Sequence, residues 1–147
     1  MADYRFQIQL PLRHTDTFAG TPFVHGGVLL ALTELALDSY DRAAGIPCHR
    51  DVIRMQASTE VRYLAPLRWD DGAVISMRCT RLLPGRLTFE CEVASEAEGR
   101  AVAKMTHNYA YVNAQSGRSE VPEDWSQITE AIREYESDIE IDEQARV

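Results

Sequence analysis

Apolar side chains change their spacing twice in the first half of the chain. Over residues 5–13 they alternate with polar ones, which predicts a strand with one buried face. From Val28 to about Ala44 they recur at helical spacing, and Gly45 follows, so the pattern predicts one long helix that ends there. Alternation then returns and predicts a second strand with one regular face. That face consists of Ile53, Met55, Ala57, Thr59, Val61 and Tyr63.

Turn-forming residues divide the remainder of the chain. Alternating runs between residues 75 and 112 predict successive antiparallel hairpins and, with the earlier strands, a sheet of about five strands. Pro122 then opens a segment with an apolar stripe at helical spacing, which predicts a short terminal helix. The turns lie at Asp70-Asp71-Gly72, Pro84-Gly85, Glu98-Gly99 and Ser116-Gly117.

The order of these elements predicts an α+β domain in which one antiparallel sheet wraps around one long helix. We interpret residues 1–135 as a single domain, because 147 residues with 45% hydrophobic content suffice for one core but not for two ordinary domains. Residues 136–147 are acidic and poor in core-forming side chains, so we expect them to fray. Such a sheet leaves an edge strand unpaired, which favours association of two copies through that edge.

Composition and charge argue against several classes of protein. The formal net charge of −8 disfavours nucleic-acid binding, which depends on neutralising phosphates with Lys and Arg. The sequence has neither the basic and apolar start of a secretory signal nor a run of ~18 apolar residues, so we expect a cytoplasmic protein without membrane partners. Cys48, Cys79 and Cys91 form no CxxC pair, which predicts free thiols and neither a metal site nor a cofactor.

The segment from Arg13 to Tyr40 carries the residues that are candidates for catalysis. A polar loop leads to His25-Gly26-Gly27 at the predicted helix start, where two glycines let the backbone approach a ligand. The free N–H groups of a first helical turn can stabilise a carbonyl oxygen that becomes negative during acyl transfer. Glu34 follows about two turns later at the border of the apolar face, where partial desolvation is expected.

The stretch HGGVLLALTELA resembles the helix-initiating HGG…(D/E) motif of hot-dog-fold thioesterases. The segments STEVRYLAPLRWDDGAVISMRCTRL, LTFECEV and AVAKMTHNYAYV are similar to the central strands of acyl-CoA thioesterases related to 4-hydroxybenzoyl-CoA thioesterase. The resemblance implies the hot-dog fold and hydrolysis of an acyl-CoA to a free acid and CoA. It also implies that Glu34, nine positions after His25, is the catalytic nucleophile or general base.

The loop before the helix departs from the family pattern. The related branch usually carries its catalytic aspartate in a DTDxxG-like loop, whereas this chain reads Asp16-Thr17-Phe18-Ala19-Gly20. Phe18 stands where the aspartate is expected, and Asp16 stands where the first acid of the motif would be. We therefore favour Glu34 as the catalytic carboxylate and keep Asp16 as the alternative.

The resemblance implies roles for further residues. Gly26 or Gly27 would supply the oxyanion N–H, His25 would orient the substrate, and Asp38 would position water or the thioester. Because sites of this family are built across a dimer interface, we expect a homodimer or a dimer of dimers in which Glu34 meets residues of another subunit. The residues expected to contact the substrate are Asp38, Phe18, Arg62, Arg81 and Arg86, the arginines through the CoA phosphates.

Other interpretations remain open at this point. His25 could simply cap the helix, and Glu34 could be a solvated helix residue. A non-catalytic acyl-CoA-binding protein is favoured by Phe18 in place of the expected acid. An acyl-thioester dehydratase would need an acid where Leu32 stands.

Overall fold

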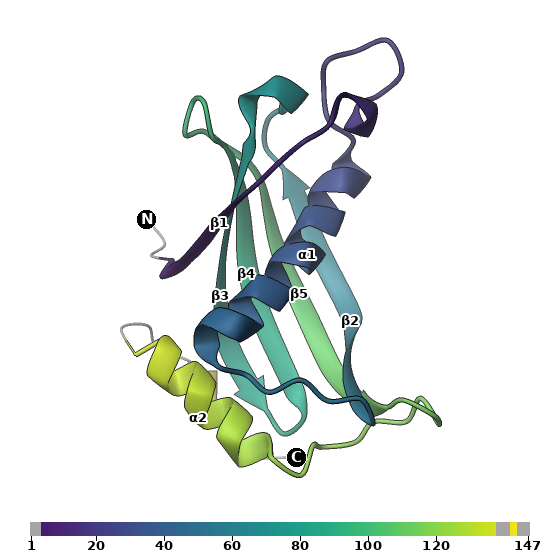
Figure 1. Cartoon of the computed structure of the whole chain (residues 1–147), viewed down its shortest axis with the longest axis vertical. Coiled ribbons are helices and arrows are strands. Elements are labelled where there is room, and N and C mark those ends of the chain that lie inside the picture. Colours follow the sequence, from purple (N-terminus) through teal and green to yellow (C-terminus); the bar gives the residue numbers. More distant parts are fainter. Residues whose placement is uncertain (1–3, 138–141, 144–147) are drawn as a thin grey trace.

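Among the described residues, five antiparallel strands and a short sixth form one sheet, and helix α1 lies across one face of it (Figure 1). The computed structural model describes residues 4–137 and 142–143. The strand order is β1-β3-β4-β5-β2, and β6 pairs in parallel with β3. The strands are β1 (Phe6–Leu10), β2 (Val52–Tyr63), β3 (Ala73–Leu83), β4 (Arg86–Ser95), β5 (Ala101–Asn113) and β6 (Asp142–Glu143). The α-helices are α1 (Gly26–Ala44) and α2 (Trp125–Tyr135), and short 3-10 helices lie at His14–Asp16 and Trp69–Asp71.

The predicted α+β arrangement, one sheet around one helix, is confirmed by this topology. β1 is shorter than the predicted strand over residues 5–13, and Pro11, which has no N–H for a ladder bond, follows its last residue. α1 begins at Gly26, two residues before the predicted start, because glycines contribute nothing to an apolar pattern. In the described part of the chain, no helix is long and apolar enough to cross a membrane.

A bulge in β2 changes which of its side chains face the helix. The register with β5 shifts between Gln56 and Ser58, so the alternation is interrupted there. Gln56 pairs with the buried Tyr109, whereas on the other side of the bulge Thr59 pairs with the buried His107. The prediction that residues 53–63 form one regular face is therefore wrong. Before the bulge the even-numbered residues face α1, and after it the odd-numbered ones do.

α1 has one buried side and one open side. Its exposed side carries Leu35, which is 64% exposed, and the neighbouring edge strand β2 exposes Met55 and Tyr63. Large apolar side chains on an unpaired edge and on the adjoining helix mark a surface suited to another protein chain. The buried side of α1 consists of Leu29, Leu32, Thr33, Ala36, Leu37 and Tyr40.

A buried carboxylate anchors the end of α2. The Tyr40 hydroxyl donates to Glu136 Oε2 over 2.6 Å, and the backbone N–H of Cys79 donates to the same oxygen over 2.9 Å. Glu136 was expected to belong to an acidic fraying tail, but these two donors hold it in the core. The backbone of Asp142 and Glu143 pairs with β3. Residues 138–141 and 144–147, the rest of that expected tail, lie outside the described residues.

His107 on β5 is fully buried and bonded on both sides of its ring. The Thr33 hydroxyl donates to the carbonyl of Leu30 over 2.7 Å, so the histidine Nε2, 2.9 Å from Thr33 Oγ1, must donate to that oxygen. Nδ1 then carries the single lone pair of the ring, which accepts one hydrogen bond; Thr59 Oγ1 lies 2.6 Å and the Gln56 amide nitrogen 2.8 Å from it. This network joins α1, β5 and β2 on both sides of the bulge, and burial lowers the pKa of His107.

The lowered pKa of His107 predicts a loss of stability in mild acid. Because the folded state binds fewer protons than the unfolded state, this contribution is present above the unfolded pKa of about 6.5 and is lost as the pH falls. The free energy of unfolding should fall by at most about 1.4 kcal/mol per pH unit below that value. Urea unfolding of wild type and His107→Gln at pH 7.5, 6.5 and 5.5 measures this, and their stability difference should shrink toward pH 5.5. A difference that stays constant with pH would contradict the assignment.

Candidate active site

The loop before α1 is a tight turn fixed to the segment after β2. The backbone N–H of Phe18 donates to the carbonyl of Phe23 over 3.0 Å, and the N–H of Val24 donates to the carbonyl of Leu67 over 2.8 Å. His25 caps the helix in an extended conformation. The N–H groups of Gly26 and Gly27 belong to the first helical turn and have no acceptor within the helix, whereas the N–H of Val28 donates to the carbonyl of His25 over 3.1 Å. The two glycine N–H groups are positioned as donors for a ligand oxygen.

Asp16 is occupied in holding this loop. Its carboxylate accepts the backbone N–H of Arg13 at 2.7 Å and a guanidinium N–H of Arg13 at 3.1 Å. These bonds keep the pKa of Asp16 below its usual value. Its carbonyl also accepts the N–H of His25 at 3.0 Å, which ties the turn to the helix cap. The side chain is nearly buried and is absent from the lining of both pockets beside α1.

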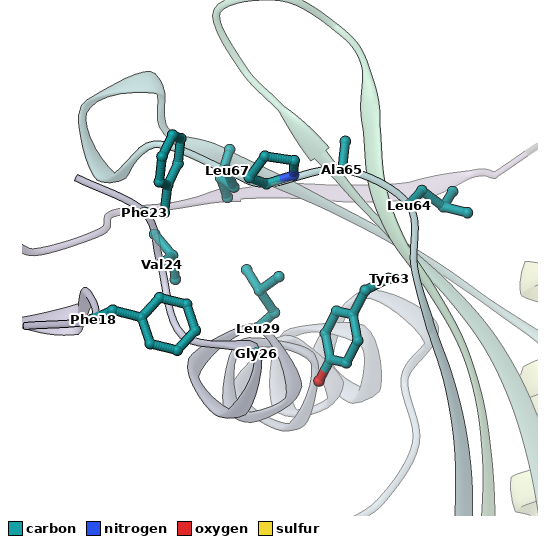
Figure 2. A pocket seen from close by; sticks show the side chains of 10 residues that line it. Phe18, Phe23, Val24, Gly26, Leu29, Tyr63, Leu64, Ala65 and Leu67 are labelled. Atoms are coloured by element: carbon teal, nitrogen blue, oxygen red, sulfur yellow. The ribbon is translucent and has the colours of Figure 1, made fainter. Parts of the chain in front are cut away.

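A pocket of about 460 Å³ opens at the start of α1 (Figure 2). Figure 2 shows Phe18 and Tyr63 on opposite sides of it, with Gly26 and Leu29 of the helix between them. The Phe18 ring also packs on His25, with 4.3 Å between ring centroids. A Cβ atom on Gly26 would lie 2.7 Å from the Tyr63 hydroxyl oxygen. The glycine therefore allows the tyrosine to lie directly on the helix start, whereas Gly27 has open space around it.

Glu34 lies in the middle of α1, half-buried, beside a second pocket of about 430 Å³. The Tyr109 hydroxyl donates to Glu34 Oε1 over 3.1 Å. Burial and the neighbouring Glu34 charge raise the pKa of Tyr109. Asp38 lines the same pocket and pairs with Arg42 over 2.9 Å on the exposed surface. The second pocket thus joins the two helix acids that the sequence singled out.

Sequence reasoning missed the residues that support Glu34. Tyr109 alternates with apolar neighbours on β5, so its position in the sequence suggests an ordinary core residue. The available signal was its hydroxyl, because a buried tyrosine hydroxyl usually has a hydrogen-bond partner. Arg54 forms an ion pair with Asp41 and lies over the Tyr109 ring at 5.7 Å from its centroid. Arg54 faces α1 only because of the bulge in β2, which no periodicity of the sequence revealed.

The two parts of the candidate site are separated along one helix. Gly26 and Glu34 are eight residues apart, which corresponds to about 12 Å of helix. A glutamate side chain does not span that distance to a carbonyl oxygen bound at the helix start. Within one chain, these residues therefore do not form a single reaction centre.

The three arginines expected at CoA phosphates lie at two ends of the sheet. Arg62 pairs with Lys104 of β5, whereas Arg86 pairs with Ala110, six residues further along that strand, or about 20 Å. Arg81 lies on β3 near the same hairpin as Arg86. One phosphate group cannot contact both ends, so the structure does not bring the three arginines together.

Solved structures of the same architecture support the fold assignment. The thioesterase from Thermus thermophilus in complex with coenzyme A and zinc has a TM-score of 0.74 at 24% identity, over 93% of this chain and 98% of that one. For a 1,4-dihydroxy-2-naphthoyl-CoA thioesterase from Synechocystis, the TM-score is 0.72 at 14% identity, with 84% and 93% covered. A Pseudomonas aeruginosa protein has a TM-score of 0.76 at 19% identity, with 96% and 95% covered. At these identities the likeness establishes the hot-dog fold alone.

Comparison of the sequence with protein families, rather than the fold, gives the class to which this hot-dog domain belongs. The sequence model of the Thioesterase superfamily matches residues 21–102, more than half of the chain. The chain belongs to this superfamily, and the predicted thioester hydrolase is confirmed at this level. No curated protein matches the sequence.

Proposed function

We propose that the protein hydrolyses an acyl-CoA to a free acid and CoA, at a site shared by two subunits. The observation that carries this proposal is the separation of about 12 Å between Gly26 and Glu34 on one helix. If both act on one thioester, the helix start of one subunit and the carboxylate of the other must meet. The active enzyme is then a homodimer.

The geometry of β2 favours this arrangement. α1 and β2 run in opposite directions, since Gly26 lies on Tyr63 while Asp41 pairs with Arg54. Antiparallel pairing of two β2 edges about their midpoints would bring the Tyr63 end of one subunit to the Arg54 end of the other. Glu34 lies in the pocket at that Arg54 end. The helix start of one subunit would then lie beside Glu34 of its partner.

The chemistry follows from these two groups. The carbonyl oxygen of the thioester accepts the Gly26 N–H, which stabilises the negative charge of the tetrahedral intermediate. Glu34 either attacks the carbonyl carbon, releasing the CoA thiolate and leaving a mixed anhydride that water cleaves, or removes a proton from an attacking water. Both routes yield the free acid and CoA. The Tyr109 hydroxyl holds one carboxylate oxygen and leaves the other for reaction.

Coenzyme A as the thiol is supported by relatives of the same fold. One of them is a complex with coenzyme A, and another is named for a CoA thioester. The dehydratase alternative lacks its acid, since Leu32 is buried in the core at that position. The alternative of a non-catalytic acyl-CoA-binding protein is distinguished from a thioesterase by an assay of thiol release.

Release of free thiol from acyl-CoA substrates tests the proposed function. We expect purified protein to release CoA from several of acetyl-, hexanoyl-, octanoyl- and benzoyl-CoA, as followed with a thiol reagent, and to elute as a dimer in light scattering. CoA binding in calorimetry without thiol release from any of them would instead establish a non-catalytic binding protein.

A further inference from the structure

We propose that the pocket at the start of α1 receives the acyl group, and that this acyl group is apolar and uncharged. This assignment rests on the proposed function and adds the class of substrate to it. It also states which of the two pockets beside α1 takes the acyl end of the thioester.

The linings of the two pockets differ in charge. None of the ten described residues that line the pocket at the helix start is charged. The pocket beside Glu34 is lined by Asp38, Asp41 and Arg54, among others. An apolar acyl chain gives up no hydrogen bonds when it enters the first pocket, whereas a charged or strongly polar group would lose hydrogen bonds to water there without replacement.

The pocket lies where the acyl side of a thioester bound at the start of α1 would extend. Gly26, the proposed oxyanion donor, belongs to its lining. A carbonyl oxygen bound at the Gly26 N–H therefore places the next acyl carbons directly in this pocket. Leu29 and Leu67, both buried, lie behind the entrance, and the volume of about 460 Å³ accommodates a medium-length chain or an aryl ring.

The aromatic side chains at the entrance also indicate an apolar occupant. Phe18 is 47% exposed although its ring flanks the pocket opposite Tyr63 (Figure 2). Burying such surface against an acyl chain is favourable. A charged side chain at position 18 would instead place a charge in this wall.

A matched pair of substrates tests the class of acyl group. Hexanoyl-CoA and adipoyl-CoA have acyl chains of equal length and differ in a terminal carboxylate. We expect kcat/KM to rise by roughly threefold to fourfold per added CH₂ from acetyl to hexanoyl. We expect adipoyl-CoA to be at least roughly 100-fold poorer than hexanoyl-CoA, because its carboxylate would be buried without a partner.

Variants of Phe18 test the pocket itself. Phe18→Gln should lower kcat/KM for hexanoyl-CoA by roughly tenfold and barely change it for acetyl-CoA, whereas Phe18→Leu should stay within roughly threefold of wild type for both. Val121→Ala, an exposed apolar position remote from this pocket, is the matched control and should leave both substrates unchanged. Because Phe18 is half exposed, both of its variants should retain the melting temperature of wild type.

The outcomes separate this assignment from the proposed function. Adipoyl-CoA turnover equal to that of hexanoyl-CoA, or Phe18→Gln with an unchanged chain-length dependence, overturns the assignment and leaves thioester hydrolysis standing. Phe18→Gln that weakens the dimer without altering chain-length dependence assigns the pocket to subunit contact and also overturns it. Absence of thiol release from every acyl-CoA overturns the proposed function, and the assignment with it.

Discussion

Glu34→Gln is expected to lower kcat for acyl-CoA hydrolysis by roughly 10³-fold while the fold and the dimer remain intact. Glutamine has the same shape and can still accept the hydrogen bond from the Tyr109 hydroxyl, so the core around it is preserved. It can neither attack the thioester nor take a proton from water. Steady-state kinetics with thiol detection measure the loss, and light scattering with thermal melting checks the integrity of the protein.

Two further variants calibrate the effect of Glu34→Gln. Tyr109→Phe removes a single hydrogen bond to the carboxylate and should reduce kcat only by about fivefold. Asp16→Asn should act only through the loop, because Asp16 is bonded to Arg13 and lies outside both pockets. Near-normal activity of Glu34→Gln, together with a loss of comparable size in Asp16→Asn, would move the catalytic role to the loop acid.

Gly26→Pro is expected to lower kcat by roughly 10²–10³-fold, because proline removes the N–H that stabilises the oxyanion. Proline is well suited to the first position of a helix, and His25, with φ −60° and ψ 141°, already has the conformation preferred before proline. Gly26→Ala is the matched control, since its Cβ meets the Tyr63 hydroxyl in the same way but the N–H is retained. Equal losses in the two variants would show that crowding, and not the missing donor, is responsible.

Mixing the two inactive variants tests whether the site is shared. In a heterodimer of Glu34→Gln and Gly26→Pro, one site would combine the intact Gly26 of one subunit with the intact Glu34 of the other. Random exchange of equal amounts should therefore restore about one quarter of wild-type activity. If both residues of a site came from the same subunit, no intact site would form and the mixture would stay inactive.

Local sequence features were sufficient to predict the architecture, the helix start and the position of Glu34 on the helix. The spacing of apolar residues predicted the long helix and the antiparallel strands, because each element must present one apolar side to the core. His25-Gly26-Gly27 indicated the helix start, since two adjacent glycines before a helical apolar pattern are a local signal. Placing Glu34 at the border of the apolar face predicted a partly buried side chain, and it is half-buried.

The tertiary structure decided what depends on contacts between distant segments. The bulge in β2 is defined only by its pairing with β5, and it turns Arg54 and Gln56 toward α1. Glu136 is buried because Tyr40 and Cys79, distant in sequence, supply donors that its acidic surroundings gave no reason to expect. The hydrogen bond from the Tyr109 hydroxyl to Glu34 likewise joins residues that are distant in sequence.

The sequence by itself thus determined the fold class, the helix start and the helix acid, because these follow from periodicity and from neighbours within a few turns. Only the tertiary structure distinguished the surroundings of the two acids, by engaging Asp16 in the loop and leaving Glu34 beside a pocket. The distance of about 12 Å between the helix start and Glu34 follows from the helix alone, because eight residues of an α-helix span it. The tertiary structure added the opposite directions of α1 and β2, which depend on contacts between segments distant in sequence.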